Sequence, residues 1–214
     1  QVSATDRKKF TFSAWIKRSQ LSSGSQNIYE SFYDASNRIT LWINSSDQIR
    51  IWYPSSGSTA VELNSNQLLK DCNAWYHIVL TGDTTQSTQA DRMKLYINGS
   101  RVTAWGTNSV NLSLNQALDI GTTGYKHNIS RYGTGSADTF FGLMSHIHFT
   151  DGYAYDASAF GETDSTTGEW KIKTSPSVTY GNNGFFILKD GNSTTDHSGN
   201  SASFTTGGTL TNTE

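Results

Sequence analysis

Two neighbouring segments of the sequence carry aromatic and cationic side chains at alternate positions, which is the spacing of one face of a β-hairpin. In residues 38–44 the face opposite the aliphatic side chains includes Trp42, and in residues 48–53 it includes Arg50 and Trp52. A three-residue loop between the segments would set Trp42 opposite Arg50, with Trp52 on the diagonal. The sequence therefore predicts two indoles around one guanidinium.

Such a surface is flat and amphipathic, and three interpretations of it stay open. The indole faces can stack on sugar rings, and the same rings with an arginine suit the centre of a protein–protein contact. Alternatively, a loop or a neighbouring sheet of the same domain covers the tryptophans and makes them a second layer of core. Burial within the domain, a subunit contact and glycan binding are thus the hypotheses for Trp42, Arg50 and Trp52.

The histidines and serines offer less chemistry. His146 and His148 are two residues apart, so a strand would place both on one face, but a metal site needs further ligands that the sequence does not identify. His77 lies within an apolar segment and is predicted to be a hydrogen-bonded core histidine. There is no Gly-x-Ser-x-Gly nucleophile elbow.

The elements that must position these residues are predicted to be strands. Alternating or continuous apolar patterns indicate strands at 9–17, 27–33, 38–44, 48–53, 75–80, 92–98, 101–105, 117–121, 138–150 and 184–188. Asn98-Gly99 predicts a tight turn between the sixth and seventh of them. Residues 156–160 suggest one helical turn capped by Asp156, and residues 163–177 are polar and irregular.

Strands at this spacing, with Gly, Asn and Ser between them, predict an all-β fold with very little helix, a two-sheet antiparallel jelly-roll sandwich. We expect residues 1–190 to form one jelly-roll domain. Residues 191–214 would form a Ser/Thr/Gly-rich surface tail or a connection to a following segment. Because the chain begins with Gln1 rather than Met, we expect it to be a piece of a longer protein.

Composition excludes several classes of protein. The 16 Lys and Arg residues against 18 Asp and Glu residues give a net charge of −2, without the basic surface that nucleic acid binding needs. The only cysteine, Cys72, excludes an internal disulfide framework and a four-cysteine metal site. No apolar run approaches the ~20 residues that span a bilayer, and the first residues lack the apolar core of a signal peptide.

Three stretches, in this order, resemble the laminin-G-like and pentraxin-like branch of the concanavalin-A-like jelly rolls. They are Phe12-Ser13-Ala14-Trp15-Ile16-Lys17; Trp75-Tyr76-His77-Ile78-Val79 with Lys94-Leu95-Tyr96-Ile97-Asn98-Gly99; and Ile120-Gly121 with Phe141-Gly142-Leu143 through Ile147-His148-Phe149. The resemblance covers most of the chain and implies the concanavalin-A-like lectin/glucanase fold.

A narrower resemblance extends over the last third of the chain. Phe149-Thr150-Asp151-Gly152, Phe160-Gly161-Glu162-Thr163-Asp164 and Thr167-Gly168-Glu169-Trp170-Lys171 resemble a signature common in virion proteins of bacteriophages, mainly marine and cyanobacterial ones. Tyr180-Gly181-Asn182-Asn183-Gly184-Phe185 and Asp196-His197-Ser198-Gly199-Asn200 continue it. In those proteins the module belongs to tail fibres, head fibres or capsid decorations.

The resemblance implies further candidate site residues. Trp105, Tyr125 and Tyr132 lie on or near loops of the kind where jelly-roll lectins present ligands. Calcium is the usual ion of this family, and Asp119 and Asp138 are the candidate ligands. Its glucanases need a close carboxyl pair, which the spacing of Glu162, Asp164 and Glu169 does not match, so we expect no catalytic residues.

The function expected from the sequence is that of a non-catalytic, lectin-like surface module of a phage virion. It would attach to host surface glycan or to the virion, assembled in the host cytoplasm, as a homo-oligomer with other virion subunits (a trimer by analogy with fibres). The alternatives are a structural decoration or assembly protein that binds no sugar, and a glycan-cleaving enzyme. No nucleic acid partner and no membrane insertion are expected.

Overall fold

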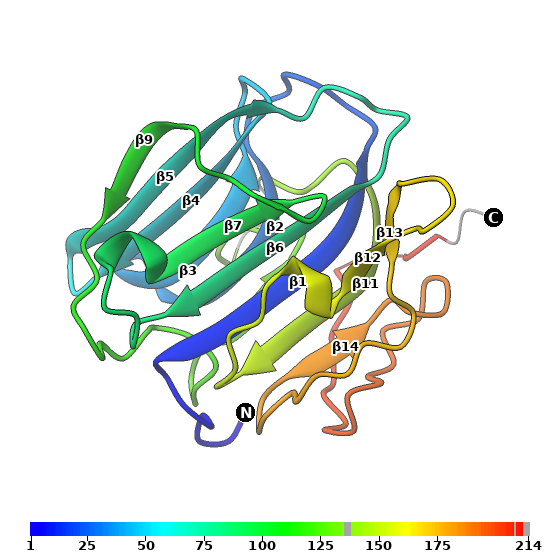
Figure 1. Cartoon of the computed structure of the whole chain (residues 1–214). Coiled ribbons are helices and arrows are strands. Elements are labelled where there is room, and N and C mark those ends of the chain that lie inside the picture. The colour runs from blue at the N-terminus through cyan, green and yellow to red at the C-terminus, as the bar shows by residue number, and fades with distance from the viewer. Residues whose placement is uncertain (135–137, 208, 212–214) are drawn as a thin grey trace.

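Two six-stranded antiparallel sheets, packed face to face, make up the computed structural model of the chain, which describes residues 1–134, 138–207 and 209–211 (Figure 1). Sheet A has the strand order β14-β11-β1-β6-β7-β8, and sheet B has the order β10-β2-β3-β4-β5-β9. The predicted jelly-roll sandwich is confirmed. The described helices are two single 3-10 turns. One of them, Ala157–Ala159, has the predicted N-terminal cap, in which the Asp156 carboxylate accepts a hydrogen bond from the Ser158 N–H.

The strands range from two to eleven residues, and tight turns join β2 to β3, β4 to β5 and β7 to β8. Their bounds are β1 (Lys9–Arg18), β2 (Gln26–Asp34), β3 (Asn37–Ile43), β4 (Gln48–Ser55), β5 (Ser58–Leu68), β6 (Tyr76–Asp83), β7 (Met93–Ile97), β8 (Ser100–Arg101), β9 (Trp105–Val110), β10 (Lys126–Ile129), β11 (Gly142–Asp151), β12 (Gly161–Thr163), β13 (Trp170–Ile172) and β14 (Phe185–Ile187).

The core lies between the sheets and is built from the alternate residues that the sequence pattern marks. On β1 the inward side chains, Phe10, Phe12, Ala14 and Ile16, are all fully buried. Sheet B contributes aliphatic residues from β3 and β4 and the ring of Tyr29, which stacks on Phe12 at 4.2 Å between ring centres. Because the side-chain period of a strand is two, the residues between these positions face outward.

The hairpin of β3 and β4 has the predicted register. Trp42 pairs with Arg50, and Thr40 pairs with Trp52. The Asn44 N–H donates to the Gln48 carbonyl at 2.9 Å, which closes the three-residue loop. The outward face of this hairpin therefore carries both tryptophans, and the other sheet does not cover them.

Several predicted strands are wrong in extent. Residues 117–121 form no strand; Leu118 and Ile120 are buried in a loop whose backbone bonds to Arg7. The strand expected at 101–105 is the two-residue β8, after which the chain crosses to sheet B as β9. The strand expected at 138–150 begins only at Gly142.

Two strands of sheet B were missed from the sequence. β5 has polar residues at most outward positions and a fully buried serine, Ser65, at an inward one, so its apolar alternation is short. β10 is a four-residue edge strand with one aliphatic residue, Ile129, which packs against the core together with the ring of His127. Both strands pair with neighbours that the sequence did predict, so backbone hydrogen bonding rather than apolar content defines them.

The segment predicted to be irregular, 163–177, contains β13, which forms a small hairpin with β12 over the outer face of sheet A. Its Trp170 donates from the indole N–H to Nδ1 of His77 at 2.9 Å. A Cβ at Gly99 would lie 2.7 Å from the Trp170 ring, and φ is +82° at this glycine. The Asn98-Gly99 turn is thus needed both for the tight β7–β8 connection and for the seat of the indole.

His77 is the predicted hydrogen-bonded core histidine. Its Nε2 lies 2.8 Å from the Ser13 hydroxyl, and its ring is stacked on Trp15 at 4.8 Å between centres. Burial lowers the pKa of His77 to about 3, so the ring is neutral at ordinary pH. Because an indole N–H can only donate, Nδ1 of His77 accepts from Trp170 and Nε2 carries the proton. His77 therefore donates to Ser13 and does not act as its base.

The segment after Asp190 lies against β14. The Asp196 carboxylate accepts from the Phe186 N–H at 2.9 Å, and Phe204 packs edge-on against Phe185 at 4.8 Å between ring centres. The described part of the predicted tail is thus in contact with the edge of sheet A.

Candidate functional site

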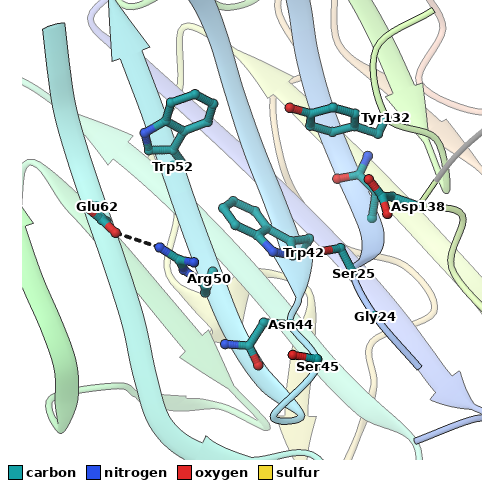
Figure 2. Close-up of a pocket in the computed structure, with 11 residues that line it drawn as sticks. Gly24, Ser25, Trp42, Asn44, Ser45, Arg50, Trp52, Glu62, Tyr132 and Asp138 are labelled. Carbon is teal, nitrogen blue, oxygen red and sulfur yellow. Dashed lines mark hydrogen bonds and ion pairs between the residues drawn. The ribbon is translucent and has the colours of Figure 1, made fainter. Parts of the chain in front are cut away.

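The outward face of sheet B is hollowed into a groove of about 520 Å³ (Figure 2). We call it the tryptophan groove. Residues from β2 to β5, from the loops at one end of these strands and from the segment between β10 and β11 line it: Gly24, Ser25, Asn27, Trp42, Asn44, Ser45, Arg50, Trp52, Glu62, Tyr132 and Asp138. The volume falls in the range typical of small-ligand sites.

One wall of the groove is built on Trp42. The Arg50 guanidinium carbon lies 5.2 Å from the centre of the indole, and Arg50 Nη2 is 2.6 Å from Glu62 Oε1 (Figure 2). About a third of each side chain of this ion pair is exposed. Asn44 and Asn64 add side-chain amides nearby, which hydrogen-bond to one another at 3.3 Å. This wall thus offers an indole face together with donors and acceptors in fixed positions.

The second wall is a stack of three side chains. The Arg38 guanidinium carbon lies 4.8 Å from the centre of Trp52 and 4.7 Å from that of Tyr132. Arg38 is buried between these rings, at 8% exposure. The predicted picture of two indoles sharing Arg50 is therefore wrong in this respect, because each tryptophan has its own arginine.

Glu30 fixes the loop that carries Tyr132. It is fully buried on the outward side of β2 and accepts from the Gly133 N–H at 2.6 Å and from the Asn128 amide at 3.0 Å. Its other oxygen is 3.8 Å from Arg38 Nη1. A buried carboxylate needs such partners, so Glu30, Arg38 and the loop stabilise one another. Neither Glu30 nor Arg38 was predicted to be a site residue, although the alternation of its strand puts Arg38 on the same face as Trp42.

The end of the groove formed by the β3–β4 loop is held by a buried ion pair. Arg18 Nη1 lies 2.9 Å from Asp47 Oδ1, and both side chains are almost fully buried. Burial by itself raises the pKa of Asp47, but hydrogen bonds from Ser22 and Arg18 outweigh it and lower this pKa below its usual value. The loop that carries Ser45 is thus anchored to β1 and to the β1–β2 connection.

Of the predicted site residues, the structure brings Trp42, Arg50, Trp52, Tyr132 and Asp138 together at the groove. Trp105 is not there: it begins β9, pairs with the fully buried Ser65 and packs partly against the core.

Tyr125 and Asp119 also lie elsewhere, in a network at the edge of the core. Asp119 Oδ1 accepts from the Tyr125 hydroxyl at 2.9 Å and is 3.4 Å from Arg7 Nη2. Its Oδ2 accepts from Tyr53 at 3.1 Å and from Ser55 at 3.2 Å. Burial, followed by the bond to Asp119, raises the pKa of Tyr125, so this hydroxyl stays a donor.

The geometry does not fit a calcium ion shared by Asp119 and Asp138. Both oxygens of Asp119 are already occupied by donors, whereas Asp138 is exposed at the groove. Within residues 1–134, 138–207 and 209–211, no cluster of three or more His, Cys, Asp or Glu side chains could hold a metal. Calcium dependence stays a prediction.

His146 and His148 contact the same ring, that of Phe186, at 5.8 and 3.9 Å between ring centres. Nδ1 of His148 is 2.9 Å from the Tyr180 hydroxyl, and burial lowers the pKa of this histidine well below its usual value. These contacts give His148 a structural role.

The chain belongs to the concanavalin A-like lectin/glucanases superfamily, which residues 1–151 match. This class agrees with the two-sheet sandwich. A search of curated proteins found no match. In the described residues, no helix is long and apolar enough to span a membrane.

Solved structures with a similar fold come from diverse proteins. The enzymatically active domain of tailspike protein 2 from bacteriophage CBA120 has a TM-score of 0.52 at 16% identity, over 75% of this chain and 24% of that one. The SAP-like pentraxin of Limulus polyphemus has 0.46 at 15%, over 69% and 65%. Domain 4 of an arabinanase from Geobacillus stearothermophilus, solved with arabinotriose, has 0.47 at 18%, over 72% and 64%. At these identities the similarity concerns the fold alone, and the chain spans less than two thirds of each of the three proteins.

Proposed function

We propose that the chain is a non-catalytic, lectin-like surface module of a phage virion protein, a tail fibre, head fibre or capsid decoration, and that it attaches to host glycan through the tryptophan groove. It acts at the virion surface after assembly in the host cytoplasm, as part of a homo-oligomer. The observation that carries the glycan assignment is the groove itself, where Trp42 and Trp52 are only half-buried on an outward sheet face.

The groove has the composition that sugar binding requires. Aromatic faces bind the apolar faces of sugar rings, and a few fixed polar groups orient the hydroxyls. Here the Arg50–Glu62 pair and Asn44 supply donors and acceptors beside Trp42. The guanidinium groups are themselves oriented by ion pairs and rings, so little side-chain entropy is lost on binding.

The virion assignment is supported by the sequence resemblance to phage surface proteins over 149–200. It is also supported by the presence of the same fold in a phage tailspike, at a TM-score of 0.52. The tailspike domain is described as enzymatically active, so the chemistry of the carboxylates in this chain has to be considered separately.

The two glutamates on the outward face of sheet B are too far apart for glycoside hydrolysis. Glu30 pairs with Thr40, Thr40 with Trp52, and Trp52 with Glu62, so the two glutamates are three strands apart, or about 14 Å at a strand spacing of about 4.8 Å. Retaining and inverting glycosidases need about 5–9.5 Å.

The Asp164 carboxylate of the β12–β13 hairpin lacks the raised pKa of a general acid. The Asp164 carboxylate is 2.8 Å from Lys171 Nζ. This contact lowers the pKa of Asp164, whereas a general acid needs a raised one.

The test is binding of the isolated 214-residue chain to a broad array of immobilised oligosaccharides. Trp42→Ala and Trp52→Ala are measured beside Trp75→Ala, which removes an exposed indole (38%) that does not line the groove. We expect binding that Trp42→Ala abolishes and Trp75→Ala leaves within twofold, with unchanged circular dichroism. The same measurement in the presence of a chelator tests whether binding depends on calcium.

Equal loss in all three variants, or no binding to any glycan, would count against the proposal and favour the structural alternative. Trp42 and Trp52 would then be covered by another chain. Sedimentation of the protein and of the Trp42→Ala variant would show this as an oligomer that the substitution dissociates.

A further inference from the structure

The charges around the tryptophan groove pair with one another, except for one. Arg50 is paired with Glu62 at 2.6 Å, and Arg38 is buried beside Glu30 at 3.8 Å. Asp138 is exposed and has no ion-pair partner among the described residues. Every other residue that lines the groove is uncharged, so the groove has a net charge of one negative unit.

The backbone fixes the position of Asp138. Its carbonyl accepts from the Asn27 N–H at 2.7 Å, and its φ is +55°. Asn27 lines the same end of the groove, and its buried side-chain oxygen has no donor within the described part of the chain. The exposed charged group at this end of the groove is therefore the Asp138 carboxylate. Figure 2 shows Asp138 across the groove from Glu62, with Trp42 between them.

We propose that the tryptophan groove takes an uncharged glycan and that Asp138 excludes acidic ones, those that carry carboxylate, sulfate or phosphate. This inference rests on the proposed function and names the class of ligand. A neutral sugar carries no charge for the Asp138 carboxylate to repel. An anionic substituent at this end of the groove meets the negative charge of Asp138.

The cations of the groove do not compensate an acidic ligand. Arg50 already binds the Glu62 carboxylate, and the faces of Arg38 are covered by Trp52 and Tyr132. A ligand anion would have to break one of these contacts to gain a partner. A ligand with a unit negative charge about 4 Å from Asp138 should bind about fivefold more weakly in water than a neutral one, and more weakly still at a partly desolvated site. Low ionic strength leaves this repulsion unscreened.

The experiment uses matched pairs of immobilised oligosaccharides: neutral gluco-, galacto- and manno-oligosaccharides beside their uronate or sulfated counterparts, at low ionic strength. The variants are Asp138→Asn and, as a control with the same change of net charge, Asp190→Asn, which is exposed outside the groove. We expect the native chain to prefer the neutral member by fivefold or more. Asp138→Asn should raise acidic binding about fivefold and so remove most of the preference for the neutral member, and Asp190→Asn should leave that preference unchanged.

The failures of the two proposals are distinguishable. Tighter binding of the acidic members, still abolished by Trp42→Ala, would overturn this inference and leave the proposed function in place. Discrimination that Asp138→Asn leaves unchanged would overturn the role of Asp138. Absence of binding to every pair would refute both.

A measurement without sugar tests the same charge. Iodide, an anion, and caesium, a cation, both quench indole fluorescence. The fluorescence of Trp42 is obtained as the difference between the protein and its Trp42→Phe variant. We expect Asp138→Asn to raise iodide quenching of Trp42 and to lower caesium quenching. If neither changes, the field of Asp138 does not reach the groove and the inference fails.

Discussion

Replacing Glu30 by glutamine should loosen the Tyr132 wall of the groove. The carboxylate accepts from the Gly133 N–H and the Asn128 amide through one oxygen, and its other oxygen faces Arg38. In Glu30→Gln, a single carbonyl oxygen can keep the first two bonds. The amide NH₂ then faces the guanidinium, which stays buried at 8% exposure without its carboxylate.

The magnitude follows from the burial of the pair. Hydrogen bonds to charged groups contribute about 1.5–3 kcal/mol, and breaking a buried ion pair costs about 3–5 kcal/mol. Because the 3.8 Å contact is long and Arg38 keeps its two ring contacts, we expect a loss of about 2–4 kcal/mol in the free energy of unfolding.

The matched control is Glu62→Gln, the same chemical change in the ion pair with Arg50 on the same face of sheet B. About a third of each of these side chains is exposed, so the expected loss is about 0.2–1 kcal/mol. Both values come from urea unfolding, and the amide proton of Gly133 reports on the loop by hydrogen exchange.

Equal losses in the two variants would refute the reasoning, because they would mean that burial does not distinguish the two pairs. A large loss in Glu30→Gln with unchanged exchange at Gly133 would refute the assignment of Glu30 as the anchor of the Tyr132 loop.

Three further predictions concern the support of the fold. His77 and His148 are buried and neutral, and burial lowers the pKa of His77 to about 3. The unfolded chain, in contrast, takes up these protons below about pH 6.5. The free energy of unfolding should therefore be at its full value above that pH and should fall by up to about 1.4 kcal/mol per pH unit for each histidine as the pH drops toward 3. His77→Gln should reduce that slope by one proton in urea titrations at several pH values. Gly99→Ala would place a Cβ 2.7 Å from the Trp170 ring at a residue whose φ is +82°. We expect the free energy of unfolding to fall by more than about 1 kcal/mol and the indole emission to shift to the red. An unchanged free energy of unfolding would contradict the packing described for Trp170. Asp47→Asn leaves a fully buried guanidinium without its carboxylate and should cost about 3–5 kcal/mol at pH 7. Because the pKa of Asp47 is lowered, the difference from the native chain should shrink as the pH falls through that pKa, below about 3.8, and a constant difference would contradict the pairing.

The sequence by itself determined the hairpin that builds one wall of the groove. Its alternation has a period of two and its loop has three residues, and these local facts set Trp42 opposite Arg50. The same alternation identified the inward residues of β1 and the class of fold. It did not identify β5, whose partner strands, rather than its own apolar content, hold it in sheet B.

Only the tertiary structure decided what faces the tryptophans. Tyr132 and Asp138 belong to a segment far along the chain that reaches the groove because β10 pairs with β2. The long-range contacts of Gly133 and Asn128 with Glu30 then fix this segment over Arg38. Equally, Asp119 has the residue type of a metal ligand, but its carboxylate is occupied by the hydroxyl groups of Tyr125 and of two residues of the distant strand β4, Tyr53 and Ser55. Alternation and turn length act between neighbours in the chain, whereas ion pairing, ring stacking and burial depend on which distant segments meet, and no local pattern records that.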